Sequence, residues 1–246
     1  MPEAIYAIGD VHGRRDLLGK LEDEIAGDWR GCGYKDVILL YLGDVIDRGP
    51  NSAHVLDQIV SAAPHGARRA MLLGNHEDMF LAFLERPDAH LEWLDHGGAE
   101  TLGSYGIYLT AAEIKKSPRR RVQQYLQASI PSSHISALRK APRAALSGEW
   151  RFTHAGLDPS KPDSGQTAAD VTWGAVGDLS KRSECSGRLV FGHFASDSIR
   201  TVGQTICIDT GAYATGRLSA LRVSPGAACG ALKFFEVCNS EGPDRL

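Results

Sequence analysis

The sequence predicts an α/β fold, and three observations lead to this prediction. In the first third of the chain, a short apolar run followed by Gly-Asp or Gly-Asn and then by a helical pattern occurs three times. The middle, from about residue 78 to 141, carries mainly helical patterns. β-like runs resume after it and continue to residue 237. Short strands that alternate with helices are typical of a sheet built from parallel strands.

The first three predicted strands, 4–8, 37–42 and 70–73, run into Gly-Asp, Gly-Asp and Gly-Asn. Helix-like spacing follows the first two of them. The apolar positions of these two helices are Leu17, Leu18, Leu21 and Ile25 in one, and Val55, Ile59 and Ala62 in the other. Ligands of open α/β sheets gather beyond the carboxyl ends of the strands, so we expect the three glycine turns to lie together.

The middle of the chain is expected to be a helical insertion, about residues 78–141. Helical stretches at 78–85 and 119–128 flank a Gly-rich loop at 95–106, and Pro131 is expected in the first turn of a helix that continues to residue 140. Because strands resume afterwards, we expect residues 1–246 to form a single domain. The later strands are predicted at 150–153, 189–191, 205–208, 217–223 and 233–237.

Composition excludes several functional classes. A formal net charge of -3 gives no sign of a nucleic-acid partner. No run of about 18 apolar residues exists, so no membrane span is expected, and the N-terminus does not have the pattern of a signal peptide. The cysteines are scattered without a Cys-x-x-Cys pair, which argues against a disulfide framework or a thiolate zinc site and fits a reducing, cytoplasmic location. They are Cys32, Cys185, Cys207, Cys229 and Cys238.

Five short blocks carry His, Asp or Asn directly after a predicted strand: GDVHG (9–13), GDVIDRG (43–49), GNHE (74–77), THAG (153–156) and FGH (191–193). Each block alone is an ordinary turn, but the ordered set predicts a metal site. The candidate ligands are Asp10, His12, Asp44, Asn75, His154 and His193. Carboxylate, amide and imidazole ligands suit two divalent cations, with Mn most favoured and Fe or Zn also compatible. Asp44 is the expected bridge between the two ions.

The blocks GD-x-HG, GD-x-x-DRG and GNHE, in this order, resemble the calcineurin-like metallophosphoesterases. Within that family the chain is similar to the phosphoprotein phosphatase branch, and above all to compact bacterial and phage (lambda-type) Ser/Thr protein phosphatases. The resemblance extends from Gly9 to the turn IDTGAY at 208–213. It implies a four-layer αββα metallophosphoesterase sandwich with two metals at the strand ends. It also implies that a metal-bridging hydroxide attacks the phosphorus in line.

The resemblance also implies a role for each site residue. One metal would be held by Asp10, His12 and Asp44, and the other by Asp44, Asn75, His154 and His193. His76 would protonate the leaving oxygen, oriented by Asp47, and Arg48 would bind phosphate oxygens. An imidazole suits proton transfer at neutral pH, and a guanidinium fork matches a phosphate. The alternatives are that His76 is a core histidine and that Arg48 only forms a salt bridge that shapes its turn.

The chain departs from this pattern at one position. Similar phosphatases carry a second phosphate-binding arginine two residues after a tryptophan, whereas here Trp173 is followed by Gly174 and Ala175. Lys181 or Arg182 either substitutes for it or is a solvated loop charge.

Other polar residues give weaker signals. His96 either faces the substrate or is a loop residue, and His54, His65, His90 and His134 are expected at the surface. The insertion is rich in basic residues, which either attract an acidic partner or form a solvated face. They are Lys115, Lys116, Arg119, Arg120, Arg121, Arg139, Lys140 and Arg143.

Three functions therefore stay open. The first is a metal-dependent phosphatase acting on phosphoserine or phosphothreonine in a phosphorylated protein. The second is a small-molecule phosphoesterase such as a symmetrical dinucleoside tetraphosphate hydrolase. That group typically has alanine in place of Asp47, so the aspartate favours phosphate monoesters. The third is an inactive binding module, disfavoured because every expected ligand is present. The sequence gives no indication of the oligomeric state.

Overall fold

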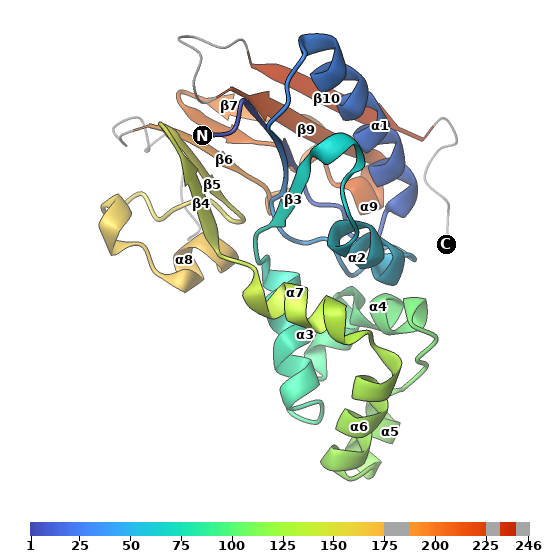
Figure 1. The fold of residues 1–246 in the computed structure, drawn as a ribbon. Helices are drawn as coiled ribbons and strands as arrows, with labels where there is room; N and C mark the ends of the chain where they lie inside the picture. The colour runs from blue at the N-terminus through green and yellow to red at the C-terminus, as the bar shows by residue number, and fades with distance from the viewer. Residues whose placement is uncertain (175–186, 225–231, 240–246) are drawn as a thin grey trace.

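A computed structural model describes residues 1–174, 187–224 and 232–239. Its core consists of two five-stranded sheets (Figure 1). The first sheet has the order β10-β9-β1-β2-β3, with β1 (Ala4–Ile8), β2 (Val37–Tyr41), β3 (Arg68–Met71), β9 (Arg217–Val223) and β10 (Lys233–Cys238). The second has the order β4-β5-β6-β8-β7, with β4 (Ala144–Ser147), β5 (Trp150–Thr153), β6 (Arg188–Phe191), β7 (Arg200–Val202) and β8 (Thr205–Cys207).

The central strands of each sheet run parallel. β1 pairs with β2 and β2 with β3 in the first sheet, while β5 pairs with β6 and β6 with β8 in the second. Parallel strands place all their carboxyl ends at one edge, and these edges carry the turns that contain the candidate site residues.

The strands divide their side chains between two cores, as the alternation of a β-strand requires. Tyr6 and Ile8 of β1 pack toward helices α1 (Arg15–Cys32) and α2 (Ser52–Val60). Ile5 and Ala7 pack toward the second sheet, against residues such as Phe152. On the outer side of the second sheet, Leu157 and Phe194 pack against Leu189 and Phe191, and α8 (Ala168–Trp173) follows η3 (Asp163–Gly165). The αββα layering that the family resemblance implied is therefore confirmed.

Helices occupy the chain between β3 and β4 and project from the strand layers (Figure 1). They are α3 (Asn75–Glu85), η2 (Leu94–Gly98), α4 (Ala99–Ser104), α5 (Ala111–Lys116), α6 (Arg119–Ser129) and α7 (Ser132–Lys140). Two further short helices are η1 (Pro64–Gly66) and α9 (Ala212–Thr215). Among the described helices, none combines the length and hydropathy that a membrane span requires.

Most predicted elements are present, and three expectations about local structure are wrong. The Gly-rich stretch at 95–106 is mainly helical, because only Gly97, with φ 101°, breaks the helical backbone within η2. Pro131 precedes α7 as its N-cap, one residue earlier than expected. Ala62 lies beyond the end of α2 and is exposed. Short elements without a clear periodic pattern were not predicted: α5, α8, α9, β4 and β7.

His134 is buried, contrary to the expectation that it lies at the surface. The side chain is 1% exposed within α7. Its Nδ1 lies 2.8 Å from the Tyr105 hydroxyl and its Nε2 lies 3.0 Å from Asp57 Oδ1. Both ring nitrogens are therefore satisfied, so a polar ring is tolerated where α7, α4 and α2 meet.

One buried carboxylate joins the turn after β2 to the start of α3. Glu77 is fully buried and accepts hydrogen bonds from the backbone N–H groups of Asp44 and Val45 at 2.8 Å. It also accepts from Ile46 N at 3.3 Å and from Gly74 N at 2.9 Å, which caps α3. Burial and the charge of Asp44 raise the pKa of Glu77 to about 7. These bonds fix the relative position of the two turns that carry most of the candidate site.

Replacing this carboxylate tests its structural importance. Glu77→Gln puts an amide N–H₂ against backbone donors, so we expect the free energy of unfolding to fall by about 2 kcal/mol. Urea denaturation measures this change. Glu85→Gln, at an exposed position of the same helix, is the matched control and should change stability by less than about 0.5 kcal/mol. Equal effects of the two substitutions would show that the hydrogen bonds of Glu77 do not contribute to the free energy of unfolding.

Candidate metal centre

The predicted ligands come from both sheets and meet where the parallel strands end. Asp10 and His12 follow β1, Asp44 follows β2, and Asn75 begins α3 after β3. His154 follows β5 and His193 follows β6 in the second sheet. All six side chains are buried except that of His193, which is half-buried. Residues far apart in sequence thus form one cluster between the two sheets.

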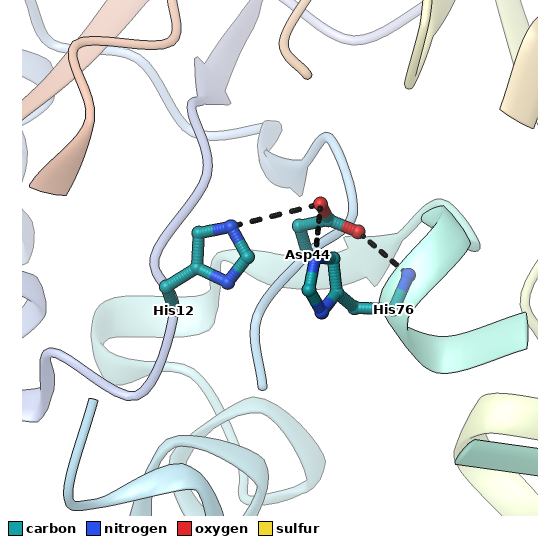
Figure 2. A group of neighbouring side chains, drawn as sticks. All are labelled: His12, Asp44 and His76. Atoms are coloured by element: carbon teal, nitrogen blue, oxygen red, sulfur yellow. Dashed lines mark hydrogen bonds and ion pairs between the residues drawn. The ribbon is translucent and has the colours of Figure 1, made fainter. Parts of the chain in front are cut away.

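The carboxylate of Asp44 faces both His12 and His76, whose rings lie against each other (Figure 2). Its Oδ2 is 3.6 Å from His12 Nε2 and 3.8 Å from His76 Nε2. His12 Nδ1 lies 2.8 Å from the carbonyl oxygen of Ile46. With Nδ1–H donating to that carbonyl, the lone pair of Nε2 faces Asp44, which is the usual arrangement of a metal-binding histidine. One ligand atom each from His12, Asp44 and His76 lies within 4.8 Å of the others.

A second group of ligand atoms uses the same aspartate. Asp44 Oδ1 lies 3.3 Å from His154 Nε2, which lies 3.0 Å from Asn75 Oδ1. His193 Nδ1 is 2.9 Å from that amide oxygen and 3.2 Å from His154 Nε2. His154 Nδ1 is within hydrogen-bond distance of the Leu42 carbonyl, at 2.9 Å, so its Nε2 is left to face the cluster. The two groups share Asp44, as expected for a carboxylate between two cations.

Buried negative charge accumulates beside these groups. Asp10 is 2% exposed and accepts from His193 N at 3.0 and 3.2 Å. Burial, together with the charges of Asp209 and Asp44, raises the pKa of Asp10 well above its usual value. Asp209, which is 3% exposed, belongs to the same buried group and was not predicted as a site residue. Its position directly after β8 was the one available signal.

The ionisation of two of the three candidate ligand histidines suits metal binding in the absence of an ion. Burial lowers the pKa of His12 to about 3 and that of His193 to about 4. Both rings are therefore uncharged at neutral pH, and each has a lone pair available for a metal ion. Burial acts in the same direction on His154, but the charge of Asp44 outweighs it and raises the pKa. Burial opposes ionisation of Asp44, yet His154 and His76 hold its pKa well below its usual value. A cluster of this composition fits divalent cations, whose charge offsets the buried carboxylates.

Backbone strain coincides with the candidate site. In the described residues, five non-glycine residues have positive φ angles, and all five are predicted site residues. They are His12 (44°), Asp44 (49°), Asp47 (70°), Arg48 (66°) and His193 (67°). This region costs free energy for residues with a Cβ, and such strain concentrates at functional sites.

A polar chain of Asp47, His76 and Arg48 borders the first ligand group. Asp47 Oδ2 lies 2.7 Å from His76 Nδ1, and Arg48 Nη2 lies 3.1 Å from His76 Nε2. Burial lowers the pKa of His76, but Asp44 and the bond to Asp47 outweigh it, so the pKa is raised. His76 thus has a partner at each ring nitrogen, and the side-chain hydrogen-bond partner of Arg48 is His76, with no salt bridge to Asp44 or Asp47 among the described residues. The proton-donor role of His76 stays a prediction.

The helical insertion holds Asp47 and Arg48 in place. Trp93 Nε1 donates to Asp47 Oδ2 at 2.8 Å, and Thr101 Oγ1 donates to Asp47 Oδ1 at 2.6 Å. The Asp47 N–H donates to Thr101 and Ser52. Arg48 N donates to the carbonyl of Gly97 at 3.3 Å, and a Cβ at Gly97 would lie 2.3 Å from Arg48 N. Sequence reasoning missed Trp93, Thr101 and Gly97, since nothing in their types identifies them as supports.

The weaker sequence signals divide into three groups. His96 is exposed on η2. Lys181 and Arg182 lie outside the described residues. In the basic insertion, Arg119 pairs with Asp88 at 2.7 Å. Arg143 pairs with Asp78, which also accepts from Trp173 Nε1 at 3.0 Å.

Curated proteins similar to this chain share one activity in their names. The chain is 27% identical over 238 residues to an asymmetrical bis(5'-nucleosyl)-tetraphosphatase of Bacillus velezensis, covering 87% of each protein. It is also 27% identical over 277 residues to a symmetrical bis(5'-nucleosyl)-tetraphosphatase of Bordetella parapertussis, covering 91% of this chain and 93% of that protein.

Solved structures agree with the fold, and the family match covers most of the chain. A crystal structure assigned to a diadenosine tetraphosphatase has a TM-score of 0.62 at 20% identity, covering 98% of this chain and 96% of that one. A cold-active protein tyrosine phosphatase of Shewanella has a TM-score of 0.52 at 15% identity, covering 95% and 80%. The family model for calcineurin-like phosphoesterases matches residues 4–193. With these matches and the strand-end cluster, the chain belongs to the calcineurin-like phosphoesterase family.

Proposed function

We propose that the chain is a divalent-metal-dependent phosphoesterase that hydrolyses dinucleoside polyphosphates. Metal-dependent hydrolysis is proposed because two groups of ligand atoms share Asp44. Beside them lie the hydrogen-bonded side chains of Asp47, His76 and Arg48. The substrate class is supported by relatives named bis(5'-nucleosyl)-tetraphosphatases, which match along nearly the whole chain. A cytoplasmic location, predicted from the scattered cysteines, is part of this proposal.

The proposed ligand sets are those that the family resemblance implies. Both share Asp44, as the two groups of side chains do, but the first set takes Asp10 in place of His76, which is assigned to proton transfer. Asp10, His12 and Asp44 would hold one cation, and Asp44 with Asn75, His154 and His193 would hold the other. Mn²⁺ is the first choice, and Fe or Zn suits the same nitrogen and oxygen ligands. When bound, the cations would supply positive charge to the phosphate oxygens and lower the pKa of the attacking water.

The protein's own groups would supply proton transfer and positioning. His76 Nδ1–H donates to Asp47, which fixes the ring and leaves Nε2 toward Asp44 and Arg48. In the contact with Arg48, Nε2 accepts. Once the guanidinium has turned to the phosphoryl group, Nε2 would take up a proton and pass it to the leaving oxygen, and Asp47 would stabilise the charged imidazole before the transfer. Arg48 would turn its guanidinium to the transferred phosphoryl group, for which its planar fork is suited.

A second candidate function is the hydrolysis of phosphoserine or phosphothreonine in a protein. The Asp47–His76 pair favours it, because a proton donor matters most when the leaving oxygen is a basic alkoxide. A nucleotide phosphate is a weaker base and needs the proton less. The curated relatives favour the dinucleotide, and we rank it first for that reason. An inactive binding module ranks third, since the full set of ligands is present.

A substrate comparison distinguishes these functions. Protein stripped of metal and reloaded with Mn²⁺ is tested against diadenosine tetraphosphate, a phosphoserine peptide and p-nitrophenyl phosphate. We expect the highest kcat/KM with the dinucleotide. Preference for the peptide would replace the proposal by the second candidate, and two bound metals without turnover of any substrate would support the binding module.

Removal of the shared carboxylate charge tests the metal arrangement. Asp44→Asn is expected to lower kcat at least about a thousandfold, since it takes a charge from both ligand groups at once. The metal content, measured by elemental analysis, should fall below two ions per chain. The matched control is Asp23→Asn at an exposed position of α1, which should retain both. Activity retained in Asp44→Asn would contradict a site built on this residue.

The proposed proton donor can be tested through the leaving group. His76→Asn should keep the metal content and slow the phosphoserine peptide by about a hundredfold or more. Hydrolysis of p-nitrophenyl phosphate should slow far less, because p-nitrophenolate leaves without a proton. Equal losses of kcat with both substrates would exclude proton donation by His76.

A further inference from the structure

Tyr213 is a site neighbour with no role in the functions considered so far. It lies on α9, directly after the turn that follows β8, and is 39% exposed. The guanidinium carbon of Arg48 lies over its ring, 4.3 Å from the ring centroid. The ring also meets the edge of His12, with centroids 5.2 Å apart and an interplanar angle of 82°. Tyr213 therefore contacts both the proposed phosphate-binding arginine and a proposed metal ligand.

The side chain of Arg48 needs positioning, because the backbone fixes only its Cα and Cβ atoms and not the guanidinium. The φ of 66° and the bond from Arg48 N to the Gly97 carbonyl set where the side chain begins. Beyond that point the guanidinium is held by His76 Nε2 at 3.1 Å and by the ring of Tyr213. A long, flexible side chain loses considerable rotamer entropy when it is ordered. Because these contacts already order Arg48 in the free protein, less of this entropy is lost when the substrate binds.

The backbone that carries Tyr213 is held by hydrogen bonds on both sides of the turn. Gly211, with φ 67°, turns the chain into α9, and its N–H donates to Asp209 Oδ1 at 2.8 Å. Arg14 Nη1 donates to the carbonyl oxygen of Ala212 at 3.0 Å. The same guanidinium donates to both carboxylate oxygens of Asp16, at 2.9 and 2.7 Å. The turn after β1 thus fixes the position of α9, which carries the Tyr213 ring under the Arg48 guanidinium.

We infer that Tyr213 is a positioning residue that orders Arg48 for the phosphoryl group of the substrate. The inference rests on the proposed role of Arg48 as a phosphate ligand. The attraction is between the guanidinium charge and the face of the aromatic ring, so it depends on the ring and not on the hydroxyl group. Phenylalanine should therefore replace Tyr213, whereas leucine keeps much of the volume and loses the attraction.

A double-mutant cycle on phosphate binding tests this inference without reference to turnover. Inorganic phosphate is titrated into the Mn²⁺-loaded wild type, Tyr213→Leu, Arg48→Ala and the double variant by isothermal titration calorimetry. Tyr213→Leu should raise the Kd about fivefold, the change expected from one cation–π contact at a partly exposed site. In the Arg48→Ala background the same substitution should change the Kd less than about 1.5-fold, because the partner is gone.

Two control variants separate the ring contact from other effects. Tyr213→Phe should bind phosphate as the wild type does. Tyr108→Leu, at a tyrosine that is 82% exposed in the insertion, should also have no effect. The metal content of every variant is measured, since a loss of metal in Tyr213→Leu would mean that the residue acts through His12.

Several outcomes would overturn the inference. These are an unchanged Kd in Tyr213→Leu, an equal loss in both backgrounds, a loss of metal, or no phosphate binding by the loaded wild type. The proposed substrate is tested separately. A protein that shows the expected cycle but does not hydrolyse diadenosine tetraphosphate would contradict the proposed function and leave the role of Tyr213 intact.

Discussion

The buried carboxylate of Glu77 is the contact on which the site depends most. It satisfies N–H groups of two turns that would otherwise be orphaned in the interior: Asp44 and Val45 after β2, and Gly74 before α3. The space is so tight that a Cβ on Gly74 would lie 2.2 Å from Asp44 Oδ1. The bonds of Glu77 join sequence blocks about thirty residues apart into one unit. They hold the N–H groups of Asp44 and of the residue after it, and so stabilise the strained φ of Asp44, 49°.

Around this unit the protein places negative charge where water cannot reach it. Asp10, Asp44 and Asp209 are each no more than 3% exposed, and the same burial keeps His12 and His193 uncharged. Burying carboxylate charge is costly unless it is compensated, and burial accordingly raises the pKa of Asp10 and of Asp209. Carboxyl groups in this arrangement suit divalent cations, whose charge would compensate them.

The candidate ligands could be predicted from the sequence because each directly follows a strand, so local pattern and topology together place them. Most strand bounds were predictable from the same pattern, whereas the four-layer arrangement came from the family resemblance. The supports could not be predicted. Trp93 and Thr101 lie far from Asp47 in the sequence, and only the fold brings them into contact with it. The Gly-rich stretch was predicted as a loop because two adjacent glycines are typical of loops, whereas it is helical apart from a break at Gly97. Tyr213 acts through a ring face, which has no pattern in a sequence.

The site draws on both sheets, and this has a consequence for synthesis and folding. The hydrogen bond from His193 N to Asp10 joins residues separated by 183 positions, and the contact between His154 and Asn75 spans 79. Contacts between such distant residues form late, because a long loop must close first. A chain emerging from the ribosome would complete β1, β2 and β3 well before it had the two later histidines. The ligand cluster is therefore expected to be complete only after the two sheets dock, so any cation held by side chains of both sheets would bind late and would not act as the nucleus of folding.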